Sequence, residues 1–368
     1  MDSNTRFGQT ITKLIQKNNL GREEAYQAFY MMLANEVSEM QQGAFLAALT
    51  AKGETEEEVA GGWKAVYELD TCKVDLACKE ELVDNCGTGM DSFKTFNIST
   101  AASIVAAAGG VKIARHGARA ITSSCGTVDM AELLGVDVEC GVETVANSIE
   151  KSGIGLFNGM SPAVHPMALG RILSQIRFGS PLNIAASLAN PALPKNGVRG
   201  VYSKELLMPV ARVMRSIGYH NGIVVYGAID NSDRGMDEAS VCGTTHCVQL
   251  KNGELHQFSL EVEDSGLQKH PPEGLLPSRD PQQRVSHMVS LLAGRSNGAA
   301  RDAVLLNSAL IFQLRELTPT VAEGVELAAD IIDKGKALDQ LEKWVECQNR
   351  SPSEGKIHFQ RLTTEVLQ

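Results

Sequence analysis

Through the first seventy residues, apolar side chains recur three or four positions apart. Phe7, Ile11 and Leu14 begin this spacing, and two later stretches repeat it, as expected of helices that bury one face. Thr55 precedes three glutamates, so it can cap a further helix whose first turn carries favourable negative charge. The pattern predicts a small all-helical domain over residues 1–75.

The pattern changes in the segment 76–368, where short apolar runs alternate with helical stretches. The apolar runs lie at 82–83, 111–114, 155–157 and 222–226, and the helical stretches at 99–108, 142–151 and 204–217. Alternation of this kind indicates a mostly parallel central sheet with helices on its faces. We therefore predict an α/β fold in which a larger α/β domain follows the small helical one.

The remaining elements of this larger domain are predicted as follows. Residues 253–262 alternate apolar and polar side chains, as in an edge or antiparallel strand, and residues 263–280 read as a long loop. Three helices are expected to follow, over 282–293, 299–315 and 319–347, the last broken near Gly335.

Composition narrows the class of protein. The chain has 368 residues and a formal net charge of −10, which argues against a general nucleic-acid binder with a basic face. Its longest apolar stretch, 101–114, is interrupted by Ser103 and Lys112 and is too short to span a bilayer. Eight scattered cysteines and a polar first segment favour a reducing, cytoplasmic location without a membrane anchor.

A glycine-rich segment directly follows the apolar run at 82–83. Gly87 and Gly89 let the backbone approach a ligand closely and present N–H groups to an anion. Asn97, Ser99 and Thr100 then open an alanine-rich helix, whose free N–H groups and hydroxyls suit a phosphate. A tight turn followed by an ordinary helix cap explains these residues about equally well.

Two further polar segments follow apolar runs. Arg115, His116 and Arg119 come after the second run, and a hydroxyl-rich stretch at 122–127 follows them. The cations could neutralise phosphate, although a solvated strand end is the alternative, and His116 is as often structural as ligand-binding. Strand ends of a parallel sheet meet at one edge, where ligands bind in open α/β folds.

An acidic pair, Asp237 and Glu238, follows the fourth apolar run. Magnesium prefers a few carboxylates together with substrate phosphate oxygens, so the pair is a candidate metal site. Taken alone, an acidic turn is the favoured alternative. Cys242, His246 and Cys247 lack a second pair at zinc-finger spacing and are interpreted as core or strand positions.

Taken in order, these motifs resemble the signature run of the anthranilate phosphoribosyltransferase family. The matching segments are 87–91, 97–100, 115–119, 126–129, 188–192, 235–238, 323–326 and 335–337, with Asn183. Each piece is weak, but the ordered set covers nearly the whole chain and is specific.

The resemblance implies a small helical domain, to which residues from about 163–180 contribute, a larger α/β domain and a homodimer. It implies transfer of phosphoribose from phosphoribosyl pyrophosphate (PRPP) to an aromatic amine, by default anthranilate, with Mg²⁺ as cofactor and, in the family, a place in tryptophan biosynthesis. It implies positioning as the mechanism, with no dedicated catalytic acid or base. The implied PRPP-binding residues are Gly87, Thr88, Gly89, Asp91, Ser92, Thr95, Asn97, Ser99, Thr100, Arg115 and Thr127, and the implied metal ligands are Ser99, Asp237 and Glu238.

The sequence departs from the family pattern mainly on the acceptor side. Ala118 stands where the family has an asparagine, and Met90 replaces a glycine. The segment that carries the family's acceptor-facing arginine is about two residues shorter, so that Arg171 or Arg177 could substitute. The acceptor-binding residues are therefore expected to be His116, Ala118, Arg171 and Arg177.

We hypothesise a working PRPP site with an acceptor that differs from anthranilate. The alternatives are a nucleoside-phosphorylase-like reaction and a non-catalytic, nucleic-acid-binding relative. Phosphate binding by nucleic-acid partners needs many cations on one face, which the acidic composition opposes.

Overall fold

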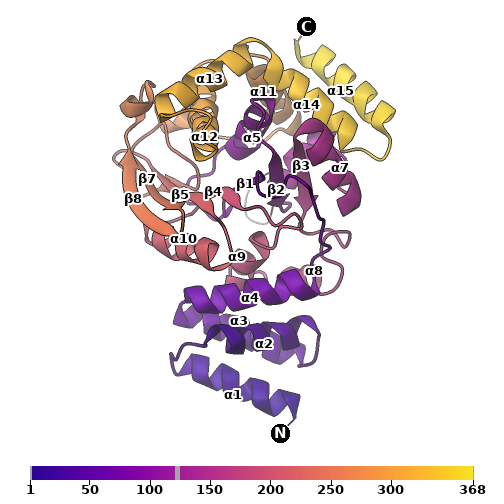
Figure 1. Ribbon diagram of the computed structural model, residues 1–368, viewed down its shortest axis with the longest axis vertical. Helices are drawn as coiled ribbons and strands as arrows, with labels where there is room; N and C mark the ends of the chain where they lie inside the picture. The colour runs from indigo at the N-terminus through magenta and orange to yellow at the C-terminus, as the bar shows by residue number, and fades with distance from the viewer. Residues whose placement is uncertain (1, 121–124, 368) are drawn as a thin grey trace.

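A computed structural model describes residues 2–120 and 125–367 of the chain. The N-terminal helices stack at one end of the molecule, and the C-terminus lies at the other (Figure 1). No helix in the described part has the length and apolar character needed to cross a membrane.

The helical end is a bundle whose core comes from two separate parts of the chain. Phe29 and Phe45 pack edge to face with ring centroids 5.2 Å apart, and Leu169 and Ile172 join the same buried cluster. Thr55 caps the fourth helix in a capping box. The bundle comprises α1 (Ser3–Ile15), α2 (Arg22–Leu33), α3 (Glu39–Lys52) and α4 (Glu56–Leu69), against which α8 (Leu169–Ile176) and α9 (Pro181–Ser187) pack.

The buried carboxylate of Asp70 joins these two parts. It accepts hydrogen bonds from the backbone N–H groups of Met167 (2.5 Å), Ala168 (2.9 Å) and Leu169 (2.6 Å). These N–H groups lie at the start of α8 and have no partner within the helix. Asp70 thereby fixes the direction in which α8 leaves the α/β domain.

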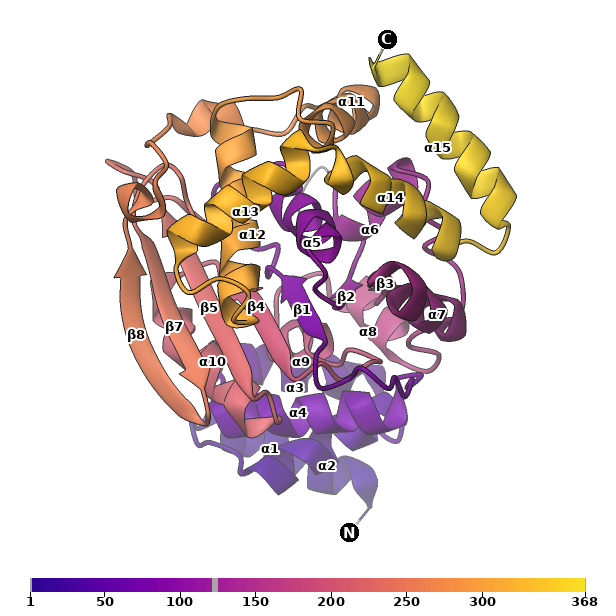
Figure 2. The ribbon, with the colours of Figure 1, turned by 45° about the horizontal axis from the view of Figure 1, so that its top comes forward.

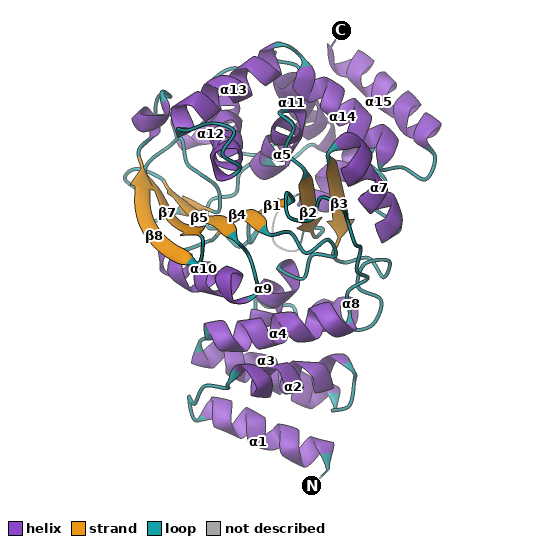
Figure 3. Ribbon diagram, viewed as in Figure 1, coloured by secondary structure: helices purple, strands orange, loops and turns teal. Residues whose placement is uncertain are grey.

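The α/β domain is built on one mixed sheet, which crosses the upper body of the molecule in Figure 3. Its order is β3-β2-β1-β4-β5-β7-β8, parallel from β3 to β5 and antiparallel beyond. A two-residue strand, β6, pairs antiparallel with the end of β5. The strands are β1 (Val83–Cys86), β2 (Ile113–Gly117), β3 (Ile154–Asn158), β4 (Asn196–Gly200), β5 (Asn221–Ala228), β6 (Gly235–Met236), β7 (Thr245–Lys251) and β8 (Glu254–Leu260).

Helices cover both faces of this sheet (Figure 2). The α5 helix is almost wholly buried between the sheet and the helices above it, and α10 packs on the opposite face against β5 and β7. The helices of this domain are α5 (Ile98–Ala108), α6 (Thr127–Leu133), α7 (Val142–Ser152), α10 (Leu207–Ser216), α11 (Pro281–Leu292), α12 (Ala299–Leu314), α13 (Val321–Asp333), α14 (Lys336–Cys347) and α15 (Pro352–Leu367).

The predicted fold class is confirmed, including the helical beginning and the mostly parallel sheet. The break near Gly335 separates α13 from α14, where Gly335 has a φ of +74°. The elements β4, β7 and α15 were not predicted. The long loop at 263–280 contains two short 3-10 turns, Val262–Ser265 and Pro272–Leu275.

Candidate active site

Three buried carboxylates meet at the carboxyl edge of the sheet. Oxygen atoms of Asp91, Asp237 and Glu238 all lie within 4.8 Å of one another. Asp91 comes from the glycine-rich loop after β1, and the other two directly follow β6. The antiparallel return of β6 along β5 brings the acidic pair back over the sheet edge.

Hydrogen bonds fasten the loop after β1 to the Asp237 carboxylate. Its Oδ2 atom accepts from the Gly89 N–H at 2.6 Å and from the Thr88 hydroxyl at 3.0 Å. Thr95 donates to Glu238 Oε2 at 3.3 Å. Lys94 pairs with Asp91 Oδ1 at 2.9 Å. The four contacts make one unit of the loop and the acidic pair.

Two glycines permit this close approach. A Cβ on Gly87 would lie 2.5 Å from Asp237 Oδ2, and a Cβ on Gly200 would lie 1.6 Å from the Asp237 carbonyl oxygen. Any side chain at either position would displace the acidic pair. These glycines are therefore required by contact rather than by an unusual backbone angle.

The cluster fits a magnesium ion by the chemistry of its donors. Hard carboxylate oxygens are the ligands that Mg²⁺ prefers, and three of them converge here without a full set of positive partners. Burial, and then the charge of Asp237, raise the pKa of Asp91 to about 6. Burial and the same neighbour raise the pKa of Glu238 well above its usual range. A cation would remove the repulsion that contributes to both shifts.

A buried guanidinium lies at the end of the neighbouring strand β2. Arg115 is 1% exposed and donates to Thr100 Oγ1 at 2.7 Å, Thr127 Oγ1 at 3.3 Å, Ser99 Oγ at 3.5 Å and the Asn85 carbonyl at 3.0 Å. Among the described residues, no carboxylate forms an ion pair with it. Burial lowers the pKa of Arg115. Such a charge calls for an anion.

The remaining residues expected to bind PRPP line the same edge. Asn97 donates to the Cys125 and Gly126 carbonyls, each at 3.3 Å, which ties the start of α5 to the next loop. Ser92 bonds to the backbone of Gly235 on β6. Residues 122–124 of the hydroxyl-rich stretch lie outside the described part of the chain.

His116 belongs to a buried pair of imidazoles. Its Nε2 lies 3.0 Å from Nε2 of His165, whose Nδ1 lies 2.5 Å from the Asp70 carbonyl oxygen. A carbonyl can only accept, so His165 Nδ1 carries a proton, and in the neutral pair His116 Nε2 donates to His165 Nε2. Burial, and then His165, lower the pKa of His116 to about 3, and burial lowers the pKa of His165. Both rings are therefore neutral at physiological pH.

Neither arginine of the shortened segment lies in the main cavity of the site. Arg171 donates to Gln42 at 3.1 Å and lies 3.6 Å from Glu39, so its head group contacts α3. Arg177 is exposed at the end of α8 with a φ of +48° and bonds to the Ser174 carbonyl.

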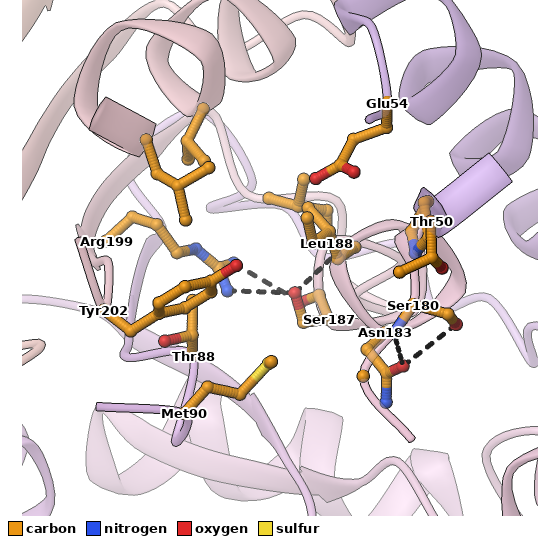
Figure 4. Close-up of a pocket in the computed structure, with 15 residues that line it drawn as sticks. Thr50, Glu54, Thr88, Met90, Ser180, Asn183, Ser187, Leu188, Arg199 and Tyr202 are labelled. Carbon is orange, nitrogen blue, oxygen red and sulfur yellow. Dashed lines mark hydrogen bonds between the residues drawn. The ribbon is translucent and has the colours of Figure 1, made fainter. Parts of the chain in front are cut away.

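The cavity lies between the helical bundle and the sheet edge (Figure 4). Thr88 and Met90 of the loop after β1, Ser187 of α9 and Arg199 of β4 face into it. It is lined by Thr50, Glu54, Thr88, Met90, Gly179, Ser180, Pro181, Asn183, Ile184, Ser187, Leu188, Arg199, Tyr202, Leu206 and Val210. Apolar surface dominates, with a few polar groups among it, as in many small-molecule sites.

Comparison with known proteins was made for the whole chain. Residues 9–69 match the helical bundle domain of the glycosyl transferase family, and residues 79–338 match its a/b domain. Anthranilate phosphoribosyltransferase of Exiguobacterium sibiricum is 36% identical over 90% of this chain and 95% of its own length. The chain belongs to the anthranilate phosphoribosyltransferase family.

Solved structures of the family agree. The anthranilate phosphoribosyltransferase from Thermus thermophilus superposes with a TM-score of 0.82 at 33% identity, covering 92% of this chain and 99% of that chain. The enzyme from Saccharomyces cerevisiae, in complex with PRPP and Mg, has a TM-score of 0.81 at 25% identity and covers 94% of this chain and 98% of that one. The expected class, a phosphoribosyltransferase, is thereby confirmed.

Sequence reasoning missed three residues of this family site. Lys94 pairs with Asp91, His165 with His116, and Arg199 lines the cavity. A histidine before a proline at 165–166 was visible, but nothing in the sequence placed it beside His116. Arg199 stands in a glycine-rich strand that was not recognised as a strand.

Asp237→Asn tests the metal site without an activity assay. The amide keeps an oxygen for the Gly89 N–H but removes one of three carboxylates. We expect Mg²⁺ affinity, measured by calorimetry, to fall at least about tenfold, since even loss of a group that orients a ligand typically costs that much. The melting temperature without Mg²⁺ should stay level or rise, because repulsion is relieved. Unchanged Mg²⁺ affinity would contradict the assignment.

His116→Gln tests the neutral imidazole pair. The folded-state pKa of about 3 lies below the unfolded value near 6.5, so wild-type stability should be lost as the pH falls below about 6.5. The variant should lose less, by up to ~1.4 kcal/mol per pH unit in that window. Urea unfolding at pH 7.5 and pH 5 provides the comparison. Equal acid sensitivity of the two proteins would show that His116 titrates normally.

Proposed function

We propose that this chain transfers the 5-phosphoribosyl group of PRPP to an aromatic amine in a Mg²⁺-dependent reaction, with anthranilate as the default acceptor. The observation that carries the proposal is the presence of two opposite charges at one sheet edge. A cluster of three carboxylates suits a metal, and the Arg115 guanidinium, surrounded by neutral acceptors, suits a phosphate. An apolar cavity adjoins both.

The donor side follows from the contacts of the loop after β1. Gly87, Gly89 and the residues around Arg115 would hold the diphosphate and ribose of PRPP, and Ser99, Asp237 and Glu238 would hold the metal. The solved S. cerevisiae relative, which shares the fold, is in complex with PRPP and Mg. Bound Mg²⁺ would neutralise charge that grows on the leaving pyrophosphate.

The residues of the chain then act mainly by position and charge. The C1–O bond of PRPP breaks, pyrophosphate leaves, and the amine nitrogen forms the new bond to C1 and releases one proton to solvent. Arg115 and the N–H groups of the loop stabilise the leaving charge, and the cavity holds the amine in line. A neutral aromatic amine needs no strong base, and the neutral, buried His116 is consistent with that.

The acceptor side supports a departure from the family. Ala118 offers no side-chain amide, and Arg171 and Arg177 contact groups outside the cavity. A relative from S. cerevisiae has been solved with 4-fluoroanthranilate. We propose that the present chain accepts a related aromatic amine through a different set of contacts.

We further propose a homodimer formed through the helical part, as the family resemblance implies. Met40 is 86% exposed and Phe178 is 41% exposed, and a surface hollow between α3 and α8 is lined in part by Ile172, Ile176 and Phe178. Apolar surface of this kind often marks an interface.

Pyrophosphate release from PRPP and Mg²⁺, with and without anthranilate and with a panel of other aromatic amines, tests the function. We expect amine-dependent release with at least one acceptor. Omission of Mg²⁺ should abolish it. Absence of release with every amine, together with absence of PRPP binding, would reject the proposal.

Ala118→Asn tests the altered acceptor site. If the missing amide limits anthranilate recognition, restoring it should lower the KM for anthranilate roughly three- to tenfold, the worth of one hydrogen bond, and leave the KM for PRPP unchanged. Ala118→Leu, which adds similar bulk without a polar group, is the matched control. Equal effects of both variants would show that bulk alone acts there.

A further inference from the structure

Arg199 is the guanidinium that lines the cavity beside the phosphoribosyl site, among the described residues. It stands near the end of β4, where it pairs in register with Cys86 of β1. Its side chain is 4% exposed. Figure 4 shows it reaching inward toward Ser187, with Tyr202 close by.

The partners of Arg199 leave much of its charge uncompensated. Asp84 provides one carboxylate oxygen, 3.2 Å from Nη2. The other acceptors are neutral: Ser187 Oγ and the Ser187 carbonyl, both at 3.3 Å, and Cys86 Sγ at 3.6 Å. Charge-assisted bonds to a carboxylate are normally about 2.7–2.9 Å long and about twice as strong. An anionic oxygen that entered the cavity would therefore displace Ser187 Oγ from Nη1.

The walls around Arg199 select the shape of such an anion. Apolar side chains that suit the faces of an aromatic ring come from Met90, Ile184, Leu188, Leu206 and Val210. A planar guanidinium at the base of an apolar slot matches a planar carboxylate on that ring.

The cavity also adjoins the donor site. Thr88 lines the cavity and donates to Asp237 Oδ2, so one residue is shared between the cavity and the acidic cluster. A ring seated between Met90 and Arg199 would lie beside the loop that we assign to PRPP.

We propose that Arg199 is the specificity-determining anchor for the acceptor and that the acceptor is an aromatic amine that carries a carboxylate. This inference rests on the proposed function for the identity of the cavity as the acceptor site. Arg199 binds the acid group and does not take part in bond making. Arg171 and Arg177 then have no part in acceptor recognition.

The test compares 2-aminobenzoate with 2-aminobenzamide, which has the same ring and amine but no charge. Both are fluorescent, so their binding can be titrated without turnover. We expect the wild-type protein to prefer the carboxylate. Arg199→Met alone would leave Asp84 buried without its partner, which is strongly destabilising, so the main variant is Asp84→Asn with Arg199→Met.

The double variant should lose about 10- to 100-fold in affinity for 2-aminobenzoate, the effect of losing a charged hydrogen bond. Its affinity for 2-aminobenzamide and its KM for PRPP should change by less than about threefold. Asp84→Asn alone removes the competing carboxylate and should strengthen binding of 2-aminobenzoate. Arg361→Met, on the exposed face of α15, is the matched control for an arginine-to-methionine change and should alter neither affinity.

Three results would overturn the anchor: no preference in the wild type, equal losses for both ligands, or loss of the preference in Arg171→Met. The two proposals fail separately. An Arg199-dependent preference without pyrophosphate release would leave the anchor standing and reject phosphoribosyl transfer. Release with several amines but no Arg199-dependent preference would do the reverse.

Discussion

The contact between Asp237 and the loop after β1 is the constraint around which the site is arranged. Like charges within 4.8 Å repel, and burial increases that cost. The arrangement persists because the backbone at Asp237 is held against Gly200 and because the Gly89 N–H and Thr88 hydroxyl bond to its carboxylate. The fold therefore supplies an electrostatic deficit that a divalent cation offsets.

The neighbouring strand end has the opposite deficit. Arg115 is surrounded by hydroxyls from Ser99, Thr100 and Thr127, which accept hydrogen bonds without cancelling its charge. A site with an uncompensated cation on one side and uncompensated carboxylates on the other fits a ligand that brings both phosphate and metal. The parallel sheet explains the proximity, since β1 and β2 are neighbours and end at the same edge.

The sequence predicted those parts of the site that are local. Glycines and hydroxyls after an apolar strand identify the loop at 87–91 and the start of α5 because the chemistry lies within a few residues. The strand β4 escaped notice because Asn196, two glycines and Arg199 interrupt its apolar pattern, leaving Val198. It is nonetheless buried throughout, since it lies in the middle of the sheet. Its arginine was missed for the same reason.

The direction of the α8 side chains also depends on tertiary structure. Leu169 and Ile172 pack into the helical core, and Asp70 fixes the start of the helix. This packing turns Arg171 toward Gln42 and away from the cavity. A sequence argument that counts residues from a motif cannot supply that rotation, because it depends on which face the bundle buries. The same limit applies to the pairing of His116 with His165, which are 49 residues apart.

The unusual residue at position 90 shows how the acceptor side can diverge while the donor side is kept. A Cβ on Gly179 would lie 2.5 Å from the Met90 Cε atom, so Met90 occupies space that a side chain at 179 would need. The bulk added to the loop after β1 is therefore compensated by the segment between α8 and α9. The Asp237 contacts depend on Thr88 and Gly89 rather than on residue 90. The cavity wall can thus change shape without moving the acidic cluster.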